Sequence, residues 1–165
     1  MVSRISTVVQ MPKTKRQKDD KTFECKWGKQ VTQQGFSMIP SLLFRAQSRL
    51  GLNPTQLAII LHIADFWWEK ENKPYPGKEK LAARLGISAR QIQRHIAELE
   101  KAGLVKRIER RAAHGGKMSN SYDLSGLVER LKALAPEFKE ADEEAQEIKE
   151  QVSRRGGLRA RKKLI

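Results

Sequence analysis

Apolar residues recur at helical spacing in several stretches of the chain, and each stretch is bounded by residues that start or stop helices. The clearest start is Asn53, because Pro54 fits the first helical position and Gln56 completes an Asn-x-x-Gln capping box. The helix that follows is apolar over most of its circumference, so we expect it to be central, with Trp67 and Trp68 in the core at its end. The sequence ENKPYPG then ends this helix, because its two prolines cannot continue it.

The pattern predicts further helices around this central one. Two short helices are expected, at 41–50 and at 78–85, and each is followed by a glycine that can end it. Another begins at Ser88, whose capping box is completed by Gln91, and it ends before Gly103. After it, the sequence LVKRIERR alternates like a strand, and NSYDLS can be its partner across a loop with two glycines. We therefore expect helices followed by a β-hairpin.

The helix that begins at Ser88 has two chemically different sides. At 100° per residue, one side is formed by Ile92, His95, Ile96 and Leu99. The opposite side carries Arg90, Arg94, Ala97 and Lys101, flanked by Gln91 and Gln93. A polar helix face is often no more than a solvated surface, but arginine can bind guanine bidentately and glutamine can bind adenine in the same way. The major groove of DNA admits one α-helix, so this face is a candidate for reading base edges.

Composition favours an anionic partner. The chain has 165 residues, a formal net charge of +14 and a pI near 10.2, which point to nucleic acid or an anionic membrane surface. It has no apolar run that could span a bilayer and no apolar core of a signal peptide near its start. Its single cysteine, Cys25, cannot form an internal disulfide. We expect a cytoplasmic protein that does not associate with membranes.

Charge is distributed unevenly along the chain. Residues 1–35 hold eight Lys/Arg and three Asp/Glu, and we expect a flexible basic arm there. Residues 154–163 hold six cations and no acid, within a basic tail that spans 154–165. Between them, residues 137–150 hold seven acids and two cations. The acidic segment is expected to be a solvated helix face between basic ends.

The segment KEKLAARLGISARQIQRHIAELEKAGLVKR (78–107) resembles the winged helix-turn-helix DNA-binding proteins. The matching features are Ala82, the turn LGIS, Ile92 and the run LEKAGLVKR that leads into the hairpin, which resembles the wing. The preceding helices are similar to those of plasmid and phage regulators and replication initiators. The resemblance covers residues 36–125 and implies a mainly α fold with a small β-hairpin, in which the winged domain is followed by a C-terminal helix at 126–153. It also implies double-stranded DNA as the partner.

The resemblance assigns roles to particular residues. Base edges would be read by Arg90, Gln91, Gln93 and Arg94. The DNA backbone would be contacted by Lys78, Lys80, Ser88, Lys101, Arg110, Arg111, His114 and Lys117. For His114, exposure in a loop explains the residue equally well.

A heptad pattern runs through the C-terminal helix. Its apolar positions alternate at spacings of four and three residues and are Leu127, Leu131, Leu134, Phe138, Ala141, Ala145, Ile148 and Val152. This seam predicts a homodimer, and the alternative is a helix folded back on its own domain. Pro136 lies within the pattern and is expected to kink or split the helix.

The sequence contains no catalytic set, no phosphate-cradling glycine motif and no cysteine or histidine pair at metal-ligand spacing. We therefore expect no enzyme activity, no cofactor, no metal and no small-molecule ligand. The function expected is a sequence-specific DNA-binding transcriptional regulator. Two alternatives stay open: a plasmid or phage replication initiator, and a nucleoprotein assembly factor that binds nucleic acid without sequence preference through its basic ends.

Overall fold

The computed structural model describes residues 24–69, 71–113, 115–116 and 118–154. The chain divides into two compact units, Met1–Ser37 and Met38–Ile165. In the described part of the first unit, residues 24–27 are helical and α2 (Lys29–Thr32) follows Gly28, but no residue of α2 is buried. The arm was expected to be flexible throughout, so these short turns are a difference. The rest of the arm, and the tail beyond Arg154, lie outside the described residues.

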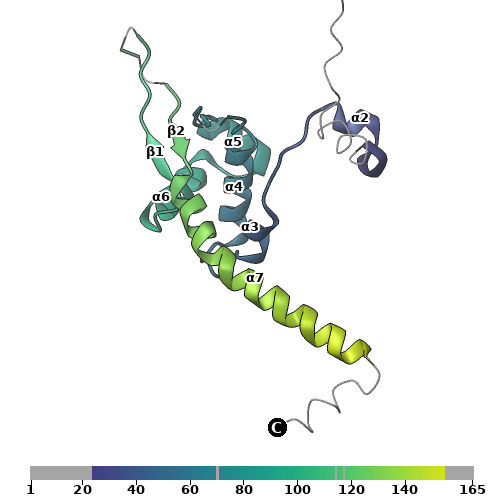
Figure 1. Cartoon of the computed structure of the whole chain (residues 1–165). Coiled ribbons are helices and arrows are strands. Elements are labelled where there is room, and N and C mark those ends of the chain that lie inside the picture. Colours follow the sequence, from purple (N-terminus) through teal and green to yellow (C-terminus); the bar gives the residue numbers. More distant parts are fainter. Residues whose placement is uncertain (1–23, 70, 114, 117, 155–165) are drawn as a thin grey trace, which may run out of the picture. The chain divides into compact units, whose positions relative to one another are not determined.

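The second unit is mainly helical with one β-hairpin, as the sequence predicts (Figure 1). Its elements are α3 (Ser41–Arg45), α4 (Pro54–Ala64), α5 (Lys78–Leu85), α6 (Ala89–Lys101), β1 (Lys106–Ile108), β2 (Ser121–Asp123) and α7 (Ser125–Ser153). Helices α4, α5 and α6 pack on one another, and their fully buried side chains form the centre of the core. These are Ile59, Ile60, Ile63, Leu81, Ile92, Ile96 and Leu99.

Local signals placed most helix starts correctly. Asn53 caps α4, and the capping box with Gln56 is complete in both directions. Gly86 ends α5 in the left-handed conformation, with a φ of 66°, which glycine adopts without a steric penalty. Helix α3 is shorter than expected, because the chain leaves the helix after Arg45 and turns before Gly51.

Helix α4 also ends earlier than expected. It ends at Ala64, where the amides of Phe66 and Trp67 bond the carbonyls three residues before them and close the last turn. Trp67 packs against the core, but the side chain of Trp68 is 71% exposed. The expectation that both tryptophans belong to the core was therefore wrong for Trp68, because the chain has already left the helix axis there.

The hairpin is antiparallel, with Lys106 opposite Asp123 and Ile108 opposite Ser121. The amide of Tyr122 donates to the carbonyl of Pro74 at 2.8 Å, so the segment after α4 lies along the outer edge of β2. Side chains alternate between the faces of a strand. Arg107 and Tyr122 therefore share one face of the hairpin, and the pairs on either side share the other.

Helix α7 docks on the domain at its start. The amide of Leu127 donates to the carbonyl of Leu104 at 3.1 Å, and Leu127 and Leu134 are buried in the core. A Cβ on Gly126 would lie 2.1 Å from the carbonyl oxygen of Gly103, so only glycine fits this approach. The end of α6 and the start of α7 are therefore in close backbone contact.

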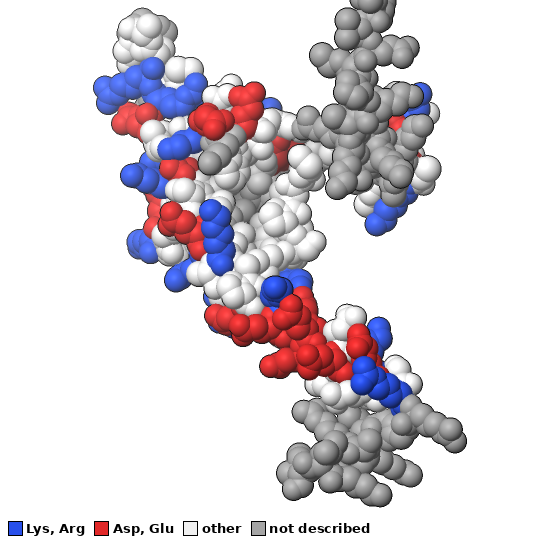
Figure 2. All heavy atoms as spheres, viewed as in Figure 1, with Lys and Arg blue, Asp and Glu red and all other residues white. Residues whose placement is uncertain are grey.

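Pro136 does not split α7, which continues to Ser153. Two ion pairs hold the helix to α3 on either side of the proline: Arg45 binds Asp142 bidentately at 2.6 and 2.8 Å, and Arg49 binds Glu137 at 2.8 Å. This packing offsets the hydrogen bond that proline removes. Beyond the last of these contacts, the helix exposes a dense acidic surface (Figure 2).

Candidate nucleic-acid interface

The interface is built around the first turns of α6. Ser88 caps the helix: its hydroxyl accepts from the amide of Gln91 at 3.2 Å, and the Gln91 Oε1 accepts from the Ser88 amide at 2.9 Å. This box fixes the first turn and confirms the local prediction. It also engages the side-chain oxygen of Gln91, so a base contact by Gln91 would use its amide nitrogen as a donor.

The predicted base-reading residues lie together on the exposed side of α6. Arg90, Gln91, Gln93 and Arg94 are exposed and, with Ser88, line one shallow hollow. Within the described part of the chain, Arg90 has no carboxylate partner, and Arg94 has only a distant one, Glu98, at 4.0 Å. The opposite side of the helix buries Ile92, Ile96 and Leu99. The amphipathic prediction for this helix is confirmed.

A small polar network fixes the orientation of α6 against α4. The carboxylate of Glu98 accepts a hydrogen bond from Gln56 Nε2 at 2.9 Å, and His95 Nδ1 lies 3.2 Å from the same oxygen. Gln56 is buried, so this contact couples the capping box of α4 to the middle of α6. Gln56 is a residue whose second role, beyond the capping box, sequence reasoning missed.

A second hollow lies between α6, the start of α5 and the hairpin. Gln93 lines this hollow as well as the first, and it is joined there by Lys78, Arg107, Met118 and Asn120. Gln93 therefore stands where the exposed helix face meets the hairpin. This continuous concave side combines amides and cations from three elements.

The hairpin is anchored to the end of α6 by a charged pair. Arg107 Nε donates to Glu100 at 2.7 Å, its second guanidinium nitrogen forms an ion pair with the same carboxylate, and its backbone amide donates to Glu100 at 2.8 Å. The Arg107 hydrogen bond lowers the pKa of Glu100. Both residues are half-buried, and this anchor was not predicted from the sequence because it depends on where the strand begins.

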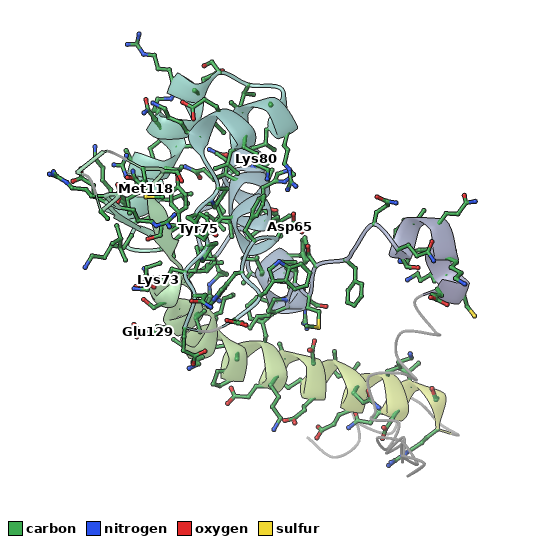
Figure 3. The ribbon with its side chains drawn as sticks, turned by 90° about the horizontal axis from the view of Figure 1, so that it is seen from above. Asp65, Lys73, Tyr75, Lys80, Met118 and Glu129 are labelled. Carbon is green, nitrogen blue, oxygen red and sulfur yellow. The ribbon has the colours of Figure 1, made fainter. Side chains whose placement is uncertain are left out.

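The predicted backbone-contacting cations fall into two groups. Lys78 and Lys101 lie at the start of α5 and the end of α6, next to the exposed face. Lys80 and Arg110 lie instead over aromatic rings, with Lys80 Nζ 4.6 Å from the centre of Phe66 and the Arg110 guanidinium 4.1 Å from the centre of Tyr75 (Figure 3). Arg111 is exposed and 3.4 Å from Glu109. His114 and Lys117 lie outside the described residues.

The predicted dimer seam is divided by the structure. Leu127, Leu131, Leu134 and Phe138 pack against the core of their own domain, so they are not available to a second chain. Their assignment to a dimer seam was wrong, because heptad spacing does not specify which surface covers it. The last four positions are exposed and are Ala141, Ala145, Ile148 and Val152.

Comparison with known proteins supports the assignment of this arrangement to a family. Residues 50–105, from the end of α3 to the start of the hairpin, match the model of a family described as a helix-turn-helix domain. The matched segment contains α4, α5 and α6, and the hairpin follows as the wing. The chain carries a winged helix-turn-helix domain. It is the DNA-binding fold that the sequence resembles.

Solved structures similar to the chain include three with low identity. The N-terminal domain of the DnaD protein from Geobacillus kaustophilus is 22% identical with a TM-score of 0.48, over 76% of this chain and 96% of that one. A possible transcriptional regulator from Methanosarcina mazei is 19% identical with a TM-score of 0.39, over 63% and 82%. The multiple antibiotic-resistance repressor of Listeria monocytogenes is 20% identical with a TM-score of 0.37, over 87% and 96%. No curated protein matches the sequence.

The winged helix-turn-helix assignment rests on the family match and the geometry, since all three TM-scores are below 0.5. In the described part of the chain, no helix is long and apolar enough to cross a membrane.

Proposed function

We propose that α6 reads base edges in the major groove of double-stranded DNA. The observation that carries this proposal is the exposed row of Arg90, Gln93 and Arg94 on the first turns of α6, beside a concave face shared with the hairpin. Arginine and glutamine supply the donors and acceptors that distinguish base pairs in that groove. Lys78, Lys101 and Arg111 would contact phosphates around it, which positions the helix without selecting a sequence.

We propose a second copy of the chain as part of this function. The exposed apolar positions on α7, from Ala141 to Val152, offer a surface for a partner helix. A dimer would place two recognition helices on two half-sites, spaced by about one helical turn of DNA or a multiple of it. This arrangement suits a regulator that binds an operator, so transcriptional regulation is the role we propose.

The test of base reading is the substitution Arg94→Ala, measured on a preferred duplex selected from a random pool and on a scrambled duplex. We expect a loss of about 1–3 kcal/mol on the preferred duplex and a smaller loss on the scrambled one. Arg130→Ala is the matched control, because Arg130 is an equally exposed cation on α7, away from α6. Equal losses on both duplexes would mean that Arg94 contacts only phosphate.

Mapping of the sites bound in cells distinguishes the biological roles. Sites at promoters support transcriptional regulation. A single cluster of repeats at an origin would favour replication initiation instead. Binding without sequence preference, which survives Arg94→Ala but not removal of the basic ends, would favour the assembly factor.

A further inference from the structure

Aromatic side chains gather on the side of the hairpin that faces away from Arg107. Phe66, Trp68 and Tyr75 belong to the segment between α4 and α5, and with Arg110 and Ser121 of the hairpin they line a hollow of about 660 Å³. The hydrogen bond from the Tyr122 amide to Pro74 and the ion pair between Lys73 and Asp123, at 2.7 Å, hold the segment against β2. Figure 3 shows Lys73 and Tyr75 beside the hairpin. We call this hollow the aromatic cradle.

Two rings of the aromatic cradle are exposed to solvent. The side chain of Trp68 is 71% exposed and that of Tyr75 is 57% exposed, although both are large apolar groups. Neither is needed to fill the core, which is formed by the isoleucines and leucines of α4, α5 and α6. Exposed aromatic rings beside a cavity are typical of surfaces that bind a flat or apolar group.

Cations accompany these rings. The Arg110 guanidinium stacks over Tyr75, and its Nη1 is buried without a hydrogen-bond partner in the described structure. Lys80 and Arg84 both lie over Phe66, at 4.6 and 4.7 Å from the ring centre. A buried donor without a partner is unusual and is satisfied when an acceptor such as a phosphate oxygen binds. Aromatic planes and an unsatisfied cationic donor thus converge in one hollow.

We propose that the aromatic cradle binds unpaired bases of single-stranded DNA. Single-strand sites combine rings on which bases stack with cations that follow the backbone. The bases of a duplex are stacked on one another, so only an unpaired base can lie flat on Trp68 or Tyr75. The cradle is distinct from the row on α6, because Arg110 and Ser121 lie on the hairpin face opposite Arg107 and Tyr122.

Acidic residues of the cradle affect which bases fit. Glu69 and Glu71 lie in the segment before α5, while Arg110 belongs to the hairpin. Carboxylates accept hydrogen bonds from the amino groups of cytosine and adenine, which thymine lacks. The phosphates would therefore follow the hairpin side, and the edges of amino-bearing bases would meet the acids. This predicts tighter binding of strands rich in cytosine and adenine than of thymine strands.

The experiment measures the anisotropy of a labelled strand of about 15 nucleotides made of dC and dA, which cannot pair with itself. We expect Trp68→Ala and Tyr75→Ala each to weaken its binding by roughly tenfold and Trp68→Phe to retain most of it, because a ring is kept. Phe44→Ala is the control, since Phe44 is an exposed ring on α3, outside the cradle. Arg94→Ala should leave single-strand binding unchanged while it weakens duplex binding.

Several results would overturn the proposal. Unchanged single-strand affinity in Trp68→Ala and Tyr75→Ala would remove it, and so would equal losses on single strand and duplex, which would make the cradle part of the duplex interface. If the parent binds no single strand but binds its duplex, the cradle serves another partner, such as a protein, and the duplex proposal survives. A ribonucleotide strand of the same order that binds more tightly would reassign the ligand to RNA. Thermal unfolding of each variant separates loss of binding from loss of fold.

Discussion

The close approach of α7 to the end of α6 makes Gly126→Ala an informative perturbation. Alanine normally stabilises a helix relative to glycine by about 1 kcal/mol, so helix propensity alone predicts a more stable protein. In the structure the added Cβ would lie 2.1 Å from the Gly103 carbonyl oxygen, whereas ordinary contact begins at 3.4 Å. The group in the way is backbone, so relief requires a shift of α7 itself.

The expected magnitude follows from what that shift disturbs. Overpacking of a well-packed site costs about 1–3 kcal/mol, and weakening the hydrogen bond from Leu127 to Leu104 costs about 1 kcal/mol more. After the gain in helix propensity is subtracted, we expect a net destabilisation of about 2–3 kcal/mol. The sign is therefore opposite to the one that propensity predicts.

Urea denaturation followed by circular dichroism gives the free energy of unfolding of each variant. Ala133→Gly is the matched control, because Ala133 is exposed on the same helix and should lose only about 1 kcal/mol from propensity. If Gly126→Ala is as stable as the parent, or more stable, α7 does not dock against Gly103 in solution, and the orientation of the helix described above is incorrect.

Three further predictions concern the pH dependence, the basic ends and the dimer. Lys73 holds the pKa of Asp123 at about 2, below its usual 3.8, so about 2 kcal/mol of stability present above pH 3.8 should be lost as pH falls toward 2, and the difference between parent and Asp123→Asn in urea titrations should shrink over that window. Deletion of residues 1–22 or 155–165 should weaken binding to every duplex alike and flatten the salt dependence by roughly 0.9 in log–log slope per lost phosphate contact; an unchanged slope after both deletions would show that the ends do not contact DNA. Ile148→Asp with Val152→Asp should turn a dimer into a folded monomer in sedimentation, because both side chains are exposed in one chain, and a monomeric parent with and without DNA would refute the dimer.

Short-range chemistry accounts for the parts of the fold that the sequence predicted. The capping boxes at Asn53 and Ser88 involve residues three positions apart, and the left-handed glycine after α5 acts on its own turn. The amphipathic division of α6 follows from its period alone, which is why its exposed row could be named in advance. These features need no knowledge of the tertiary structure.

Features that depend on distant partners could not be read from the pattern. Arg45 and Asp142 are 97 residues apart, and nothing local indicates that they meet. The same applies to Lys80 and Arg110, which have the composition of phosphate-binding residues but lie over rings. Trp68 was placed in the core because it follows an apolar helix, and the early end of α4 turned it outward. Its exposure is the observation from which the aromatic cradle was inferred.

The charge of α7 gives an independent reason to place DNA on the side of α6. Residues 137–150 carry seven acids and two cations, and only Glu137 and Asp142 are engaged by cations of α3. The remaining acids of this stretch project from an exposed helix and repel phosphates over roughly a Debye length, about 8 Å at physiological salt. A duplex bound by α6 should therefore leave the distal part of α7 in solvent. If so, charge-neutralising substitutions at Glu144 and Glu147 should change the rate of association with DNA and its salt dependence more than the rate of dissociation, because they act through the long-range field and not through contacts. An increased dissociation rate would instead place these residues in the complex.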